Sequence, residues 1–434
     1  QKKMDIDSIR QFRDRFNIPI ADDKLAGLPF YVPPADSPEM KYLHERRQAL
    51  GGYLPSRRRR ADTVPEVPPL AALDAVLKPT DREISTTMAF VRILNALLRD
   101  KNLGRHIVPI VPDEARTFGM EGMFRQLGIY SSEGQKYVPV DRDQVTYYRE
   151  DKAGQILEEG INEAGAFCSW IAAATSYSTT NVVSVPFYIF YSMFGLQRIG
   201  DLAWAAGDQR ARGFLLGGTA GRTTLNGEGL QHEDGHSHIL SSVIPNCISY
   251  DPTFSYELAL IVHDGLTRMV TRQEDVYYYI TVMNENYTHP GLPEGAEEGV
   301  LKGMYLFKPG AKLKAKAGAE KPLRVQLLGS GTILREVIAA GELLEKDWGV
   351  SADVWSCPSF TELRRDGLAC ERWNLLHPTE APRASWVEKK LKDTAGPVVA
   401  SSDYMKTFAE QIRPFIPAGR RYTVLGTDGF GRSD

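Results

Sequence analysis

The sequence predicts an α/β protein in which helices cover mainly parallel sheets. Short apolar runs typical of buried strands are separated by stretches with helical periodicity. The strand-like runs lie at 107–111, 182–194, 276–284, 353–360 and 396–405. Strands that alternate with helices usually form parallel sheets, and ligands of such sheets bind at the carboxyl ends of the strands. We therefore expect a binding site at one of those ends.

Two further segments show how strands and helices are connected. Residues 84–100 place apolar side chains at helical spacing behind a Ser/Thr cluster suited to an N-cap. Residues 324–344 predict a strand, a glycine turn and a helix. The GSG at 329–331 is not the G-x-G-x-x-G of a dinucleotide site, so we interpret it as a tight strand-to-helix turn.

A third helix is expected over residues 155–175. Its apolar stripe, at a spacing of 3.6 residues, includes Phe167, Trp170 and Ala174, and Glu163 interrupts it. The small residues at 164–166 would let another backbone or a planar ring come close. A carboxylate on an apolar face could hold or donate a proton. The alternative is an acid at the end of a helix that faces water.

The composition is that of an ordinary globular protein. A chain of 434 residues predicts two or three domains. Its net charge of −3 gives no reason to expect nucleic acid or an anionic membrane as a partner. Four widely spaced cysteines without a C-x-x-C motif, and the lack of a signal peptide or a spanning apolar run, predict free thiols in the cytoplasm. The chain opens without an initiator methionine and stops abruptly, so we expect an internal piece of a longer protein.

The segment 217–239 has the most unusual composition in the chain. It holds six glycines, the histidines His232, His236 and His238, and three acids. Glycine at this density is common where a backbone turns sharply or approaches a ligand, and imidazoles beside carboxylates can move protons near neutral pH. These residues favour an active-site loop, with a solvated polar loop as the alternative.

Metal binding is another interpretation of the same segment. The letters H-E-D-G-H at 232–236 match the H-E-x-x-H pattern of zinc-binding helices, but the glycines make a regular helix improbable. We therefore expect no metal site from these residues and favour proton transfer or substrate binding.

Several blocks of the sequence match a known family. They are PDEARTFGMEG (112–122), ILEEGINEAGA (156–166), YSMFGLQRIGD (191–201), GRTTLNGEGLQHEDGHSH (221–238), NCISYDP (246–252), ERWNLLHP (371–378) and GTDGFGRSD (426–434). Through these long blocks the whole chain resembles the first component of the homodimeric, bacterial type of pyruvate dehydrogenase complex. Enzymes of that family depend on thiamine diphosphate.

The resemblance implies three α/β domains in order. On that template, 1–62 is the tail of the diphosphate-binding domain with a linker, 63–292 is the pyrimidine-binding domain, and 293–434 is the C-terminal transketolase-like domain, incomplete at its end. The family's G-D-G motif, which binds the diphosphate through Mg²⁺, is not found in the sequence. We therefore expect the Mg²⁺ ligands outside this chain, and we expect the chain alone to bind the cofactor weakly and to be inactive.

The resemblance also implies roles for individual residues. Glu163 matches the glutamate that hydrogen-bonds the pyrimidine N1′ of the cofactor, and Phe194 looks like the aromatic residue that stacks on that ring. His232 resembles the histidine that contacts substrate and assists transfer to the lipoyl group. The remaining matches are Tyr191 and Glu228 in the polar lining near the substrate and cofactor, Arg198 in a link between the carboxylates of two active centres, Glu114 in the pyrimidine pocket, and 136–149 in a mobile loop at the entrance.

The implied reaction is oxidative decarboxylation of pyruvate, which reductively acetylates the lipoyl group of the acyltransferase component and feeds acetyl-CoA synthesis. The implied partners are pyruvate, the lipoylated acetyltransferase and a second copy of the chain. A transketolase would share the fold and Glu163 but not the GLQHEDGHSH text. A non-enzymatic alternative is a dimerisation or scaffold piece that holds half a site.

Overall fold

The computed structural model describes residues 3–53, 58–112, 115–140, 148–223, 225, 229–312 and 322–431. The chain divides into two compact units, Gln1–Arg57 and Arg58–Asp434. The first unit contains α1 (Ile6–Arg15) and α2 (Pro38–Ala49), and neither helix has a buried residue. Each begins at a side-chain cap, because Asp5 accepts from the Ser8 N–H at 2.8 Å and Ser37 accepts from the Met40 N–H at 3.3 Å.

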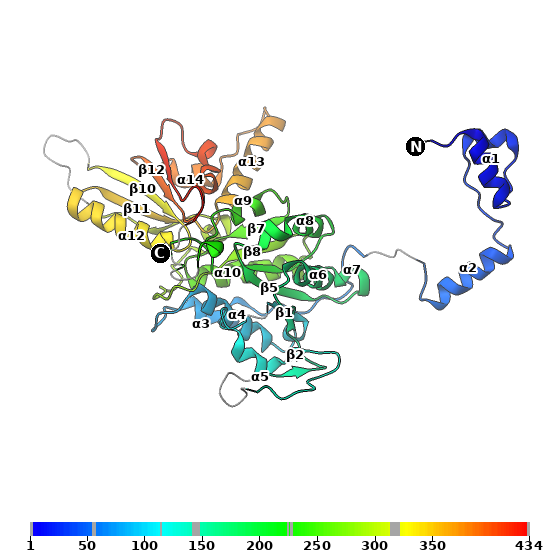
Figure 1. The fold of residues 1–434 in the computed structure, drawn as a ribbon. Coiled ribbons are helices and arrows are strands. Elements are labelled where there is room, and N and C mark those ends of the chain that lie inside the picture. The colour runs from blue at the N-terminus through cyan, green and yellow to red at the C-terminus, as the bar shows by residue number, and fades with distance from the viewer. Residues whose placement is uncertain are drawn as a thin grey trace. The chain divides into compact units, whose positions relative to one another are not determined.

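A parallel six-stranded sheet forms the first α/β domain of the second unit (Figure 1). In spatial order its strands are β4 (Leu157–Glu158), β1 (Ile107–Val111), β5 (Val185–Tyr191), β6 (Phe214–Gly218), β8 (Tyr277–Thr281) and β7 (Cys247–Tyr250). Successive side chains of β5 enter opposite cores, since Phe187 and Ile189 belong to one buried cluster and Tyr188 and Phe190 to the other. Both faces of the sheet are therefore covered, as expected for parallel strands.

Two pairs of helices cover these faces. The helices α4 (Thr86–Leu98) and α10 (Ser255–Leu266) pack together over one core, and α6 (Glu163–Ala174) and α8 (Gly195–Asp208) pack together over the other. The shorter elements are α3 (Asp74–Leu77), α5 (Phe124–Leu127), α7 (Ser176–Thr180), α9 (Ser237–Ser242), and the paired β2 (Ile129–Tyr130) and β3 (Glu150–Asp151). Across the described ranges, no helix combines the length and apolar character needed to span a bilayer.

A mixed five-stranded sheet forms the C-terminal α/β domain (Figure 1). Its strands, in spatial order, are β13 (Tyr422–Leu425), β12 (Val398–Ser401), β10 (Arg324–Gly329), β11 (Ser351–Ser356) and the antiparallel β9 (Tyr305–Lys308). Its helices are α11 (Glu297–Lys302), α12 (Ile333–Leu343), α13 (Phe360–Leu376), α14 (Trp386–Leu391) and α15 (Thr407–Glu410).

Most of the predicted elements are confirmed, and one is wrong in part. The predicted strand-like runs contain β1, β5, β8 and β12, and one run overlaps β11. The predicted cap of α4 is Ser85, which accepts from the Met88 N–H at 3.1 Å. The helix expected over 155–175 starts only at Glu163. Upstream of it the Glu159 N–H donates to the Val111 carbonyl at 3.2 Å, and Gly160 has a φ of +69°. The chain therefore joins the sheet edge as β4 and turns before the helix can begin.

A buried polar cluster joins the two α/β domains. The carboxylate of Asp251, which is 2% exposed, accepts hydroxyl hydrogens from Thr281 at 2.7 Å, Ser330 at 2.9 Å and Tyr404 at 3.2 Å. Burial raises the pKa of Asp251 to about 7, although those three donors oppose the shift. The Nε2 of His238 lies 2.8 Å from the Thr281 hydroxyl oxygen, and burial lowers the pKa of His238 to about 4. The Thr281 hydroxyl therefore links His238 to Asp251.

Candidate active site

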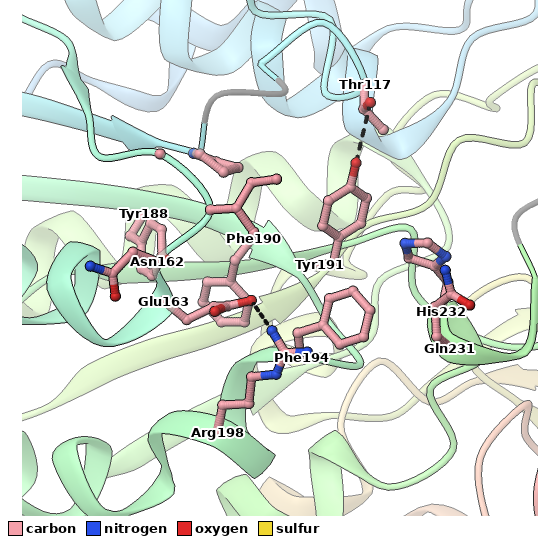
Figure 2. Close-up of a pocket in the computed structure, with 13 residues that line it drawn as sticks. Thr117, Asn162, Glu163, Tyr188, Phe190, Tyr191, Phe194, Arg198, Gln231 and His232 are labelled. Atoms are coloured by element: carbon pink, nitrogen blue, oxygen red, sulfur yellow. Dashed lines mark hydrogen bonds and ion pairs between the residues drawn. The ribbon is translucent and has the colours of Figure 1, made fainter.

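A cavity of about 490 Å³ opens at the carboxyl ends of β1 and β5, where ligands of parallel sheets usually bind (Figure 2). Its wall combines an acidic side chain, aromatic rings and an imidazole. The side chains that line it include Thr117, Glu163, Tyr191, Phe194, Arg198 and His232. The cavity therefore brings together five of the residues singled out in the sequence.

Glu163 reaches the cavity from the first position of α6. The preceding Asn162 caps the helix by accepting from the Gly165 N–H at 3.0 Å. The Glu163 side chain is 17% exposed, and its Oε1 lies 2.7 Å from Nη1 of Arg198 (Figure 2). Phe167, Trp170 and Ala174 are buried below it, as the stripe predicted. The Glu163 side chain lies at the start of the helix, before the buried residues of the stripe, and it can contact a molecule in the cavity.

The turn from β5 into α8 carries the aromatic wall. Phe194 is the N-cap residue of α8, and its ring centroid lies 6.0 Å from that of Tyr191 and 4.3 Å from the Arg198 guanidinium carbon. Close packing of α8 against Phe190 requires a glycine at 195, because a Cβ there would lie only 1.9 Å from Cε2 of Phe190. The Tyr191 hydroxyl donates to Oγ1 of Thr117 at 3.4 Å, so the tyrosine ring is oriented from a second loop.

The three clustered histidines have three different surroundings. The ring of His232 borders the cavity, with its centroid 5.0 Å from that of Tyr191 and 5.2 Å from that of Phe194. Nε2 of His236 lies 3.2 Å from Oε1 of Gln197, and His238 is buried in the cluster between the domains. Among the residues that the structure describes, no group of three or more His, Cys, Asp or Glu side chains is arranged to hold a metal ion.

Some site residues lie outside the described part of the chain, and others were missed in the sequence. Glu114, Glu228 and part of 136–149 are outside the described residues. Thr117, Asn162 and Gln231 line the cavity but were not singled out. All three belong to the distinctive sequence blocks, and Asn162 immediately before a helical pattern also had a recognisable capping signal.

Comparison with solved structures identifies the fold. The transketolase from Campylobacter jejuni superposes with a TM-score of 0.58 at 16% identity, covering 83% of this chain and 45% of that one. The transketolase from Leishmania mexicana gives a TM-score of 0.58 at 15% identity, covering 95% and 49%. At this identity the likeness concerns the fold alone, which is the transketolase-like α/β fold.

Comparison of sequences identifies the family within this fold. Residues 74–290, half of the chain, match the pyruvate dehydrogenase E1 component middle domain, and residues 303–434 match the transketolase-like C-terminal domain. The pyruvate dehydrogenase E1 components of Cupriavidus necator, Pseudomonas aeruginosa and Escherichia coli are 66%, 67% and 61% identical to it, over 100% of this chain and 48% of each relative. The chain belongs to the pyruvate dehydrogenase E1 component family, and it spans about half the length of these curated relatives.

Proposed function

We propose that this chain contributes the pyrimidine side of a thiamine diphosphate site in an enzyme that decarboxylates pyruvate. The observation that carries the proposal is the convergence of Glu163, Phe194 and His232 on one cavity. The identity of 61–67% to relatives named pyruvate dehydrogenase E1 component, over the whole chain, supports pyruvate as the substrate.

The polar and aromatic side chains of the cavity suit an aminopyrimidine, which is a planar ring with acceptor nitrogens and an amino group. Glu163 offers a carboxylate on one side, and Phe194 offers an aromatic face on another (Figure 2). Thiamine diphosphate, when bound, supplies the carbon nucleophile for reaction with a 2-oxo acid. Glu163 would share a proton with the pyrimidine N1′, and Arg198, whose Nη1 lies 2.7 Å from Oε1 of Glu163, would hold that side chain in position.

His232 and Tyr191 would act on the substrate side of the cavity. The centroids of their rings lie 5.0 Å apart, and the Tyr191 ring is oriented by the hydrogen bond from its hydroxyl to Thr117. An imidazole at this position can donate a hydrogen bond to a substrate oxygen and later move a proton during acyl transfer. Glu114 in the pyrimidine pocket and Glu228 near the substrate remain part of the proposal on family resemblance.

The other parts of the proposal rest on the family. They are Mg²⁺ bound with the cofactor's diphosphate by residues outside this chain, assembly of two copies, acetyl transfer to a lipoylated acyltransferase, and a cytoplasmic location. The domain limits 1–62, 63–292 and 293–434 stay a proposal in the same sense. Arg198 as a link between two active centres also depends on that assembly.

A substrate comparison tests the proposal. Purified full-length protein with thiamine diphosphate and Mg²⁺ should decarboxylate pyruvate and acetylate a lipoyl domain, and it should leave a ketose phosphate unchanged. Preference for the ketose phosphate would support the transketolase alternative. Consumption of neither substrate would support the scaffold alternative, and either result would overturn the proposal.

A further inference from the structure

The segment that carries His232 is tied at both ends to the C-terminal α/β domain. We define the His232 loop by its described residues, 221–223, 225 and 229–235. Two segments of the C-terminal domain hold it: 403–405, shortly after β12, and 427–431, shortly after β13. Parallel strands end at the same sheet edge, so both segments reach the loop from one direction.

Asp403 holds the first end of the loop. Its Oδ2 accepts from the Arg222 N–H at 2.7 Å, and from the N–H and the hydroxyl of Thr223, each at 3.1 Å. Asp403 is 2% exposed, so water cannot easily replace these bonds. Gly221, with a φ of +87°, permits this close approach, because a Cβ there would lie 2.3 Å from Oδ2 of Asp403.

The second end is held by backbone and guanidinium contacts. The Met405 N–H donates to the Gly235 carbonyl at 2.8 Å. The Arg222 guanidinium donates to the Thr427 carbonyl and lies so close to Gly235 that a Cβ there would be 2.2 Å from its Nη2. Thr427 in turn donates its hydroxyl hydrogen to the Asp403 carbonyl at 2.7 Å. The contacts at the two ends therefore form one connected network.

His232 lies between these two attachments. Its neighbour Glu233 is 2% exposed, and Gly431 approaches so closely that a Cβ there would be 1.9 Å from Oε2 of Glu233. The described cavity wall contains no residue of the C-terminal domain. Among the described residues, the contacts of Asp403, Arg222 and Thr427 link that domain to the loop that carries His232.

We infer that Asp403 is a positioning residue, whose carboxylate oxygen fixes the His232 loop so that the imidazole faces the cavity. The inference deepens the proposed function, because the substrate handled by His232 rests on it. A displacement of about 1 Å in a reacting group can cost about 100-fold in rate. The aromatic wall and Glu163 belong to other elements, so loss of this anchor should affect turnover without weakening cofactor binding.

Three variants of the full-length protein test the inference. Asp403→Ala removes the acceptor shared by three donors. Asp403→Asn can keep it, because the amide nitrogen can take the place of Oδ1, which is buried without a hydrogen-bond partner among the described residues. Asp353→Ala is the matched control, since Asp353 is also buried in the C-terminal domain, where it accepts from the Gly310 N–H at 2.8 Å and from Gln326 at 2.7 Å.

Hydrogen exchange and kinetics give the expected results. In Asp403→Ala, amide exchange at Arg222 and Thr223 should quicken at least tenfold, and kcat for pyruvate should fall about 10- to 100-fold. The Kd of thiamine diphosphate should stay within about twofold. Asp403→Asn should restore most of the protection and of the kcat, and Asp353→Ala should leave both near wild type.

Three outcomes would overturn the inference. They are unchanged exchange at 222–223 in Asp403→Ala, an Asp403→Asn variant as impaired as the alanine variant, and equal loss of protection at 222–223 in Asp353→Ala. The exchange measurement needs no substrate. A wild-type protein that fails to consume pyruvate would therefore contradict the proposed function, while the exchange data would still decide whether Asp403 holds the loop.

Discussion

Replacement of Glu163 by glutamine should separate catalysis from stability. The ion pair with Arg198 joins side chains that are 17% and 51% exposed. Pairs of this kind contribute about 0.2–1 kcal/mol to the free energy of unfolding. An acidic residue in the first turn of a helix contributes a further 0.3–1 kcal/mol, roughly. Glu163→Gln should therefore lower the free energy of unfolding by no more than about 2 kcal/mol.

The effect of the same change on the reaction should be much larger. A correctly placed proton-transfer group is typically worth about 10²–10⁴ in rate, or about 3–5 kcal/mol of activation free energy. The assay is steady-state pyruvate decarboxylation by the full-length protein at saturating thiamine diphosphate and Mg²⁺, with a lipoyl domain present to accept the acetyl group. Thermal unfolding followed by circular dichroism provides the stability measurement.

Glu159→Gln is the matched control for this prediction. Glu159 lies on the same segment, accepts from the Ser169 hydroxyl at 2.5 Å and is not part of the cavity wall. Its replacement should change the decarboxylation rate by no more than about twofold. Normal decarboxylation by a folded Glu163→Gln or Glu163→Ala variant would show that Glu163 does not activate the cofactor.

The remaining predictions concern His232, the buried cluster and the turn before α8. His232→Ala should slow pyruvate-to-lipoyl transfer about 10²–10⁴-fold. His236→Ala, which loses side-chain contacts to Gln197 and Asp234 away from the cavity wall, should have a small effect on the transfer rate; equal losses would refute the assignment of His232. Burial raises the pKa of Asp251 to about 7, above its value in the unfolded chain. The contribution of the protonated Asp251 to the free energy of unfolding is therefore complete below about pH 4 and is lost as the pH rises through 7. The Asp251→Asn variant lacks this titrating group. The free energy of unfolding of the variant minus that of wild type, measured by chemical denaturation, should therefore increase by a few kcal/mol from pH 4 to pH 8; a constant difference would show that Asp251 titrates normally. Gly195→Ala should lower the free energy of unfolding by about 1–3 kcal/mol or more, because the new Cβ would clash with the Phe190 ring. Gly200→Ala, in the same helix, places its Cβ in open space and should not lower the free energy of unfolding. Similar melting temperatures for the two variants would contradict the clash with Phe190.

The sequence predicted features that depend on local patterns. The strands and the capped start of α4 follow from apolar runs and from Ser85, and these signals act within a few residues. The helix over 155–175 was placed too early, because the pattern cannot show that residues 157–158 find partners on β1, nearly fifty residues away. Gly160 has a φ of +69° at this turn, but a glycine within a helical pattern does not by itself mark the end of a helix.

Contacts between distant segments account for what the sequence could not show. His238 lies in the same glycine-rich segment as His232, yet its ring is enclosed by Tyr404 and Phe408 of the C-terminal domain. Asp403 has no distinguishing local pattern in the sequence, and the role proposed for it rests on its contacts with Arg222 and Thr223. The aromatic wall was predictable only through family resemblance, because no periodicity relates Tyr191 and Phe194 to Glu163.

The most direct test is the release of labelled carbon dioxide from carboxyl-labelled pyruvate by the full-length protein in the presence of a lipoyl domain, measured with and without thiamine diphosphate. A pyrimidine site built on Glu163 predicts release that requires the cofactor and Mg²⁺ and that falls at least 100-fold in Glu163→Gln. Release that is independent of the cofactor, or that is unchanged in a folded Glu163→Gln variant, would contradict the assignment of this cavity.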